Sequence, residues 1–286
     1  MIPLREYLPL LKLRIGAFIT LSGLVAALAT AQGAVPADRM LWLAAALMLA
    51  SASAALFNQY ADRDLDRLMA RTRHRPLPAG RVRPGQVLAV GGFLALAALG
   101  VALLAFNALV ALHLLLGAFV YAVVYTVWLK RRSWLNIVIG GLAGSFAVLA
   151  GGASVRPELC LPPLLLALVM FFWTPSHFWS LAMAHRADYA RAGIPMLPVV
   201  VGPARTAWSI LVNTGLLLAS SLLPYGAGIL GRTYLAGALL AGAYFLLQNL
   251  RLVRDPSRKL AWVNFKASMV YLALLFAAVV LDVFWP

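Results

Sequence analysis

The chain contains little cysteine, little charge and few acidic residues. Cys160 is the only cysteine, which excludes an intramolecular disulfide and a cysteine-based metal site. Charged residues make up 12% of the 286 positions, about half the share found in water-soluble domains. The 9 Asp and Glu residues face 24 Lys and Arg, for a formal charge of +15. In a soluble chain that surplus would indicate nucleic-acid binding, but so low a total charge excludes a soluble globule, and we expect no nucleic-acid partner.

Hydrophobic residues are abundant instead, at 63% of the chain with a mean hydropathy of +0.88. Apolar windows of about 20 residues are long enough to cross the hydrocarbon core of a bilayer. We therefore predict an all-α polytopic membrane protein, a single domain over residues 1–286 that forms a bundle of nine transmembrane helices. The predicted spans are 14–32, 40–58, 86–106, 108–129, 135–154, 160–182, 206–228, 233–250 and 265–284. The fifth is rich in glycine, and we interpret it as a closely packed helix rather than a hinge.

The distribution of basic residues predicts the orientation. With the N-terminus in the cytoplasm, every Lys and Arg except Arg39, Arg156 and Arg232 falls in a cytoplasmic segment, as the positive-inside rule requires. We expect a multi-pass protein of a bacterial inner membrane, embedded in the lipid bilayer, with its charged face in the cytoplasm.

Three oxygen-bearing residues recur every four positions at the cytoplasmic end of the second span: Asn58, Asp62 and Asp66. On a continued helix they share one side. Carboxylates beside several arginines suit Mg²⁺ that bridges a phosphate-rich ligand, because Mg²⁺ takes one or two carboxylates plus substrate phosphates and Arg binds phosphate in bidentate fashion. The simpler alternative is a solvated helix end, which we prefer for Asp64 on the opposite side.

A basic segment follows this acidic motif. It runs from Arg71 to Arg81, and Pro76, Pro78 and Gly80 stop the helix within it. We interpret the segment as a lid that folds back over the acidic side; the alternative is a stiff loop without that role.

A second motif closes the sixth span. His177 and Asp188 are eleven residues apart, in helical register after three turns, and His185 lies on the same side. A proline-containing loop from Gly193 to Pro198 follows, as one follows the second span. These matching features predict two related halves with a site between them.

These motifs resemble those of the UbiA superfamily of intramembrane prenyltransferases, and within it most closely the protoheme IX farnesyltransferases. The resemblance rests on four stretches: Asn58–Asp66; Met69–Gly80; Tyr125–Arg132 followed by Asn136–Gly141; and Trp173–Tyr189 followed by Gly193–Val200.

The resemblance implies a heme o synthase: transfer of a farnesyl group from farnesyl diphosphate to the 2-vinyl group of protoheme IX (heme b), with addition of water, to give heme o and diphosphate for terminal oxidases. The implied cofactor is Mg²⁺, and a heme a synthase or a terminal-oxidase assembly protein is an implied partner. The implied metal site, acting through the diphosphate, comprises Asn58, Asp62, Asp66 and Asp188. The implied catalytic and diphosphate-binding residues are Arg71, Arg75, Lys130, Arg131, His185 and Asp188, with Arg14 as an addition. The implied heme-binding residues are His177, Trp173, Tyr189 and, as an alternative iron ligand, His113.

Two stretches depart from the family pattern. Lys12-Leu13-Arg14 stands where Lys-Pro-Arg is expected, and Ser145–Ala153 lacks an expected Pro-Pro and Gly-Trp-Ala-Ala run. The second departure leaves open another aromatic acceptor, namely a hydroxybenzoate, a naphthoate or chlorophyllide. A transporter is the non-enzyme alternative, although its charges would be expected near the bilayer midplane.

Overall fold

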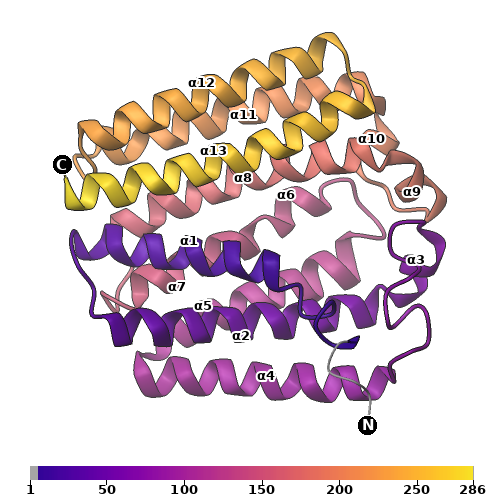
Figure 1. Cartoon of the computed structure of the whole chain (residues 1–286), viewed down its shortest axis with the longest axis horizontal. Helices are drawn as coiled ribbons and strands as arrows, with labels where there is room; N and C mark the ends of the chain where they lie inside the picture. The colour runs from indigo at the N-terminus through magenta and orange to yellow at the C-terminus, as the bar shows by residue number, and fades with distance from the viewer. Residues whose placement is uncertain (1–5, 286) are drawn as a thin grey trace.

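The computed structural model describes residues 6–285, which form a bundle of helices with no strand among them (Figure 1). Within this part of the chain, nine segments are long and apolar enough to cross a membrane, which confirms the predicted count. They are α1 (Leu13–Ala31), α2 (Ala37–Ala61), α4 (Pro84–Ala105), α5 (Ala108–Phe119) continued by the π-helix η2 (Val120–Leu129), α6 (Asn136–Gly140) continued by α7 (Leu142–Ala153), α8 (Leu161–Ala184), α11 (Gly202–Gly226), α12 (Arg232–Arg254) and α13 (Arg258–Phe284). Three short helices, α3 (Arg63–Leu68), α9 (Arg186–Arg191) and α10 (Leu197–Val200), complete the bundle.

The last span begins earlier than predicted. The hydroxyl of Ser257 accepts a hydrogen bond from the backbone N–H of Leu260, so α13 starts at Arg258 instead of residue 265. The prediction was wrong because basic residues on the exposed side of a helix can extend their charge toward water and need not end a span. As a result Arg258 and Lys259, assigned above to a cytoplasmic segment, lie within α13, as does Lys266.

Helix α8 occupies the middle of the bundle and contacts α1, α6, α7, α11 and α13. One hydrophobic cluster joins α8 to α12 and α13 through residues such as Phe245 and Tyr271. A second joins α1, α2, α5 and α7. Large aliphatic side chains also face outward, and Leu104 is 92% exposed. An apolar outer surface over a packed interior is what a lipid-embedded bundle requires.

The glycine-rich fifth span packs as predicted. A Cβ on Gly151 would overlap the backbone oxygen of Gly23 in α1, and one on Gly140 would lie 2.9 Å from the ring of Tyr125. These contacts bring α7 against α1 and α6 against η2, because small residues allow backbones to approach closely.

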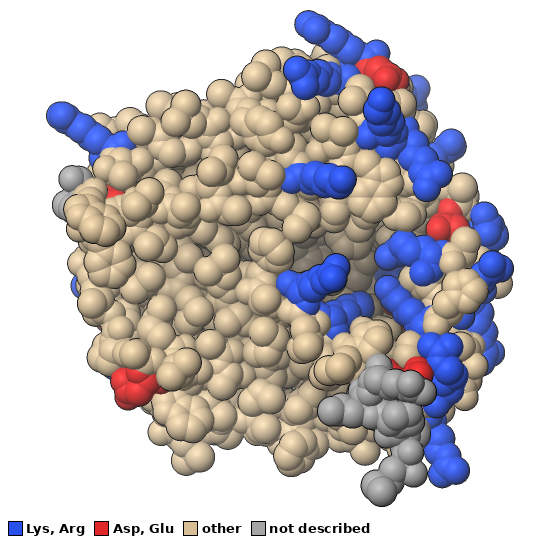
Figure 2. Space-filling view, in the orientation of Figure 1, with Lys and Arg blue, Asp and Glu red and all other residues tan. Residues whose placement is uncertain are grey.

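Basic side chains gather at one end of the bundle (Figure 2). Helices α2 and α8 both end there, in α3 and α9, as the two matching motifs predicted (Figure 1). Helix α13 ends at the opposite side, as an odd number of spans requires. That the charged end is cytoplasmic stays a prediction, and Arg5, one of the predicted cytoplasmic charges, lies outside the described residues.

Candidate active site

The acidic motif forms a buried row at the charged end. Helix α2 ends at Ala61, but the hydrogen-bond pattern continues: the Asp62 N–H donates to the Asn58 carbonyl at 2.9 Å, and the Asp66 N–H donates to the Asp62 carbonyl at 2.8 Å. The three side chains are 4% or less exposed. We call Asn58, Asp62 and Asp66 the acidic row.

Each member of the acidic row contacts a cation from a different segment. Lys130, just after η2, lies 2.5 Å from Asp62 Oδ2. Arg75, in the basic segment after α3, lies 2.8 Å from Asp66 Oδ2. Lys12, just before α1, donates to Asn58 Oδ1 at 2.7 Å. Buried carboxylates persist only when paired in this way.

Asn58 links these contacts into a network. Its Nδ2 donates to Asp62 Oδ2 at 2.8 Å and to Thr126 Oγ1 at 3.0 Å. The second oxygen of Asp62, Oδ1, is buried and has no hydrogen-bond partner among the described residues. A buried carboxylate oxygen without a partner is unusual, and it offers a further lone pair for a cation.

The basic segment folds back over the acidic row, as the lid interpretation required. Besides the Arg75–Asp66 contact, the Arg67 Nε donates to the Pro78 carbonyl at 3.2 Å, and Thr72 Oγ1 donates to the Asp66 carbonyl at 3.1 Å. The segment therefore covers one side of the site.

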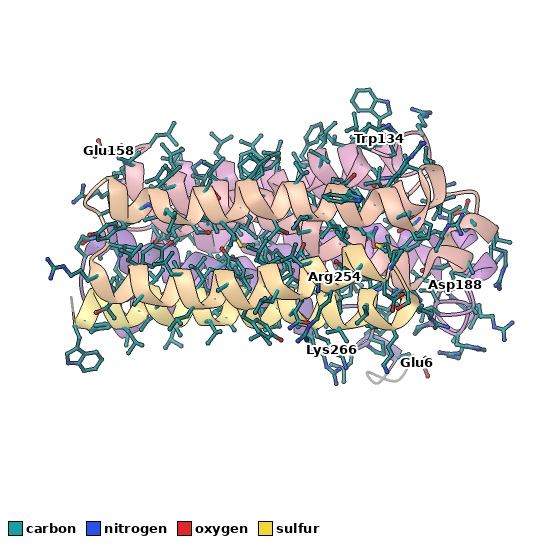
Figure 3. The ribbon with its side chains drawn as sticks, turned by 90° about the horizontal axis from the view of Figure 1, so that it is seen from above. Glu6, Trp134, Glu158, Asp188, Arg254 and Lys266 are labelled. Carbon is teal, nitrogen blue, oxygen red and sulfur yellow. The ribbon has the colours of Figure 1, made fainter. Side chains whose placement is uncertain are left out.

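The second acidic motif reaches the loop that follows the first. The backbone N–H of Ala70 donates to Asp188 Oδ1 at 3.3 Å, which brings the tip of α9 against the loop after α3 (Figure 3). His185 Nδ1 lies 3.9 Å from Asp188 Oδ2. Burial first, and then the positive charge of Arg71, lowers the pKa of His185. The structure thus brings His185 and Asp188 together, and the charge of Arg71 acts on His185.

Arg131 is not brought into this group. It makes a two-pronged contact with Asp64, at 2.8 Å for each bond, and donates to the Ala61 carbonyl. The Arg131 hydrogen bonds hold the pKa of Asp64 below its usual value. Both side chains are at the surface, on the outer side of the helix end, so Asp64 has the solvated role that was predicted.

Directly below the acidic row is a chamber with a volume of about 380 Å³, walled by α1, α2, α5, η2, α6, α7, α8 and α13. Lys12, Tyr121 and Tyr125 line it near the acidic row, and Leu47 and His113 line its deeper part. Tyr121 and Tyr125 stack with their ring centroids 5.7 Å apart, and the Tyr121 hydroxyl accepts from Lys12 at 3.3 Å. The polar site and the apolar chamber are therefore continuous.

His177 faces this chamber from α8. Its ring lies between Trp173, with centroids 4.2 Å apart, and Phe265 of α13, with centroids 4.5 Å apart. Its Nδ1 lies 2.7 Å from Ser268 Oγ, and Trp173 Nε1 donates to the Ser268 carbonyl at 2.8 Å. The imidazole is held on three sides.

The two other predicted acceptor residues lie apart from His177. His113, 5% exposed, also lines the chamber, and its Nδ1 has no partner among the described residues. Tyr189 instead packs in a hydrophobic cluster with Leu65, Met69 and Tyr125 near the acidic row.

Among residues 6–285 there is no group of three or more His, Cys, Asp or Glu side chains close enough to hold a metal ion on their own. The acidic row instead offers one carboxamide and two carboxylates, and one oxygen of the Asp62 carboxylate has no hydrogen-bond partner among the described residues. This donor set fits Mg²⁺ that takes its other ligands from a phosphate group.

A model of the UbiA prenyltransferase family matches residues 18–279. The chain belongs to the UbiA prenyltransferase family. Membership confirms the predicted recognition and makes the chain a membrane-embedded prenyltransferase, in place of the transporter alternative.

Similar UbiA proteins cover almost the whole chain. It is 53% identical to protoheme IX farnesyltransferase 1 of Paramagnetospirillum magneticum, over 98% of this chain and 99% of that protein. It is 43% identical to protoheme IX farnesyltransferase of Alkalilimnicola ehrlichii, over 97% and 92% of the two chains.

Solved structures share the fold at lower identity. A digeranylgeranylglyceryl phosphate synthase superposes with a TM-score of 0.79 at 18% identity, covering 98% of each chain. A UbiA homolog from Archaeoglobus fulgidus, solved with DMAPP and Mg²⁺, gives 0.67 at 17% identity, covering 96% of this chain and 99% of that one. The agreement confirms the UbiA fold.

Sequence reasoning understated one site residue and missed three. Lys12 was noted only as part of a departure from the family pattern, yet it contacts Asn58; its backbone adopts a left-handed conformation with φ 49° at the start of α1. Burial, and then the positive charge of Arg75, lowers the pKa of Lys12 to about 8. Tyr121, Thr126 and Ser268 were missed. Only Tyr121 could have been found from the sequence, because it lies four residues before Tyr125 and therefore on the same side of the helix.

Proposed function

We propose that this chain transfers a farnesyl group from farnesyl diphosphate to the 2-vinyl group of heme b, with addition of water, and releases heme o and diphosphate. The observation that carries the proposal is the chamber, which joins the acidic row to an imidazole held between two aromatic rings. The names of the relatives that are similar over nearly the full chain support the same acceptor.

The cations around the acidic row bind the diphosphate. Lys12, Arg75 and Lys130 each have a nitrogen against an acidic-row side chain, and Arg71 lies near His185 on the opposite side. Positive groups placed around a leaving diphosphate stabilise the charge that develops as the C1–O bond breaks. His185 completes this group beside Asp188.

Asn58, Asp62, Asp66 and Asp188 would hold Mg²⁺ together with the diphosphate, and the unpartnered Asp62 Oδ1 supports this assignment. When bound, Mg²⁺ supplies positive charge to the leaving diphosphate. The A. fulgidus UbiA homolog solved with DMAPP and Mg²⁺ supports a divalent ion in this fold.

The chamber receives the farnesyl chain and keeps water from the allylic cation until the vinyl carbon has attacked it. The second cation, on the porphyrin side, is then quenched by water, which supplies the hydroxyl of heme o and loses a proton.

His177 positions the heme through its Nε2 atom. The Ser268 hydroxyl donates its single proton to the Phe265 carbonyl at 2.6 Å, so toward His177 it acts as an acceptor. Nδ1 of His177 must then carry the ring proton, which leaves the Nε2 lone pair free. A neutral imidazole with a free Nε2 is a good iron ligand. His113, deeper in the chamber, is the alternative ligand.

We place the reaction at the cytoplasmic face of a bacterial inner membrane, on the strength of the basic residues at that end of the bundle (Figure 2). The farnesyl chain of heme o is apolar and keeps the product in the membrane, and a heme a synthase or a terminal-oxidase assembly protein is the class of partner that would consume it.

The test is to incubate the purified chain in lipid with heme b, farnesyl diphosphate and Mg²⁺, and to analyse the pigments by mass spectrometry. We expect hydroxyethylfarnesyl heme, lost on chelation with EDTA and restored by Mg²⁺. If the product is instead a prenylated hydroxybenzoate, naphthoate or chlorophyllide when those acceptors are supplied, the heme assignment is wrong and only the prenyl-donor half of the proposal stands.

A further inference from the structure

Two basic residues lie on lipid-facing sides of membrane helices, away from the acidic row. Lys266 is exposed and projects outward from α13 (Figure 3), about 12 Å from the start of that helix by the 1.5 Å rise per residue. Arg14 is exposed near the start of α1, a helix that begins farther inside the bundle than α13 does (Figure 1). A charge at this depth is costly unless it has a function.

Both residues flank an opening into the chamber. Arg14 and Ile15 of α1 and Phe265 and Met269 of α13 all line the chamber. Ile15 is also 57% exposed, so its side chain belongs to the outer surface as well as to the chamber wall. Figure 2 shows basic side chains on two sides of a hollow in this face of the molecule. The chamber therefore reaches the lipid-facing surface between α1 and α13.

Lys266 is level with His177. The His177 ring packs against Phe265, and its Nδ1 meets Ser268. These two residues flank Lys266 in α13, one before it and the other two after it. The imidazole thus lies on the inner side of α13 at the height where the lysine stands on the outer side.

We propose that Arg14 and Lys266 bind the two propionate carboxylates of the heme at the opening between α1 and α13. The inference rests on the proposed function and adds to it the binding site for the acidic edge of the acceptor. Heme carries its propionates and its vinyl groups on opposite halves of the porphyrin. Carboxylates are costly to transfer into an apolar chamber, whereas cations at the opening stabilise them there.

This arrangement sets the orientation of the acceptor. With the propionates held at the lipid-facing opening, the vinyl edge is the part of the porphyrin that enters the chamber. The two cations thereby select the edge that reaches the farnesyl group, without contacting the reacting carbon.

Lipid phosphates are the other anions within reach of these side chains, and the experiment separates the two. Heme b and its dimethyl ester, in which both propionates are uncharged, are compared as acceptors for the wild-type chain in lipid. We expect the Michaelis constant for the ester to be about tenfold higher, corresponding to about 1.4 kcal/mol. Binding of each heme in the absence of farnesyl diphosphate, measured by the quenching of tryptophan fluorescence, should show the same preference.

The variants are Arg14→Gln, Lys266→Gln and the double variant, with Lys259→Gln as the matched control. Lys259 is an exposed lysine of the same helix, on the same side and two turns nearer its start. In the double variant heme b should bind as weakly as its ester. Lys266→Gln alone should leave the Michaelis constant for farnesyl diphosphate unchanged, and Lys266→Arg, which keeps the charge, should retain the preference for heme b. The control should keep it.

Three results would overturn the proposal. The first is equal binding of heme b and its ester by the wild-type chain. The second is full retention of the preference in the double variant. The third is a loss in the variants of thermal stability alone, in vesicles that contain anionic lipid, which assigns the cations to lipid phosphate. A failure of the proposed function is separate: it would appear as no heme product from the wild-type chain, and the binding comparison would still decide the role of the two cations.

Discussion

The Nδ1 atom of His177 lies 2.7 Å from the hydroxyl oxygen of Ser268, which in turn donates to the Phe265 carbonyl. The contact joins α8 to α13 and fixes which ring nitrogen carries the proton. It connects a residue of the predicted acceptor site to one that no sequence motif contains.

Replacing Ser268 with Ala should weaken heme binding. Without the hydroxyl, Nδ1 loses its acceptor and both tautomers of His177 become accessible, so we expect the Soret band of bound heme to shift and heme affinity to fall by about tenfold, the equivalent of one hydrogen bond. Ser268→Thr, which keeps the hydroxyl, should restore the spectrum. Ser209→Ala, at a half-buried serine of α11, is the control; an unchanged spectrum in Ser268→Ala would remove Ser268 as a positioning residue.

Asp62→Asn should lower prenyl transfer by at least about a hundredfold, since it removes charge from the group that stabilises the leaving diphosphate. It also leaves Lys130 without its carboxylate, and breaking a buried pair costs about 3–5 kcal/mol, so thermal unfolding must be measured beside turnover. Asp64→Asn is the matched control, two residues away but at the surface. Equal loss of activity in both variants would contradict the special role of Asp62.

Gly151→Ala should destabilise the bundle, because the new methyl group would overlap the backbone oxygen of Gly23. Overpacking of this kind costs about 1–3 kcal/mol, measurable as a lower midpoint of thermal unfolding in detergent. Gly215→Ala, where a Cβ meets open space within a helix, should leave the midpoint unchanged or raise it. Equal midpoints for the two variants would show that α1 and α7 can separate at little cost.

Cys160 provides a test of orientation. It lies just before α8, at the end opposite the basic residues, and we expect a membrane-impermeant maleimide to label it from outside the cytoplasm. Burial raises the pKa of its thiol, so the labelling rate should still be rising at pH values where an ordinary thiol is already mostly ionised. Arg132→Cys in a Cys160→Ser background, at the basic end, should react only after the membrane is opened. The reverse pattern would invert the predicted topology.

The sequence predicts the fold well because membrane crossing depends on local quantities, length and hydropathy. It misplaces the start of α13 because hydropathy treats Arg258 and Lys259 as loop residues, whereas a helix can place such charges on one side. The spacing of Asn58, Asp62 and Asp66 predicts their common side because that depends on helical period alone. Partners distant in the chain are different: the pairing of His177 with Ser268 and of Lys12 with Asn58 depends on how separate helices pack, which no local pattern encodes.

Arg131, predicted to contact the diphosphate, holds Asp64 and the Ala61 carbonyl at the surface instead. Its neighbour in the chain is Lys130, which reaches Asp62. The exposed Arg131–Asp64 pair therefore fixes the loop that carries Lys130. Salt weakens the attraction between exposed charges. Through the exposed pair the ionic strength of the surrounding water should influence the geometry of the buried Lys130–Asp62 pair.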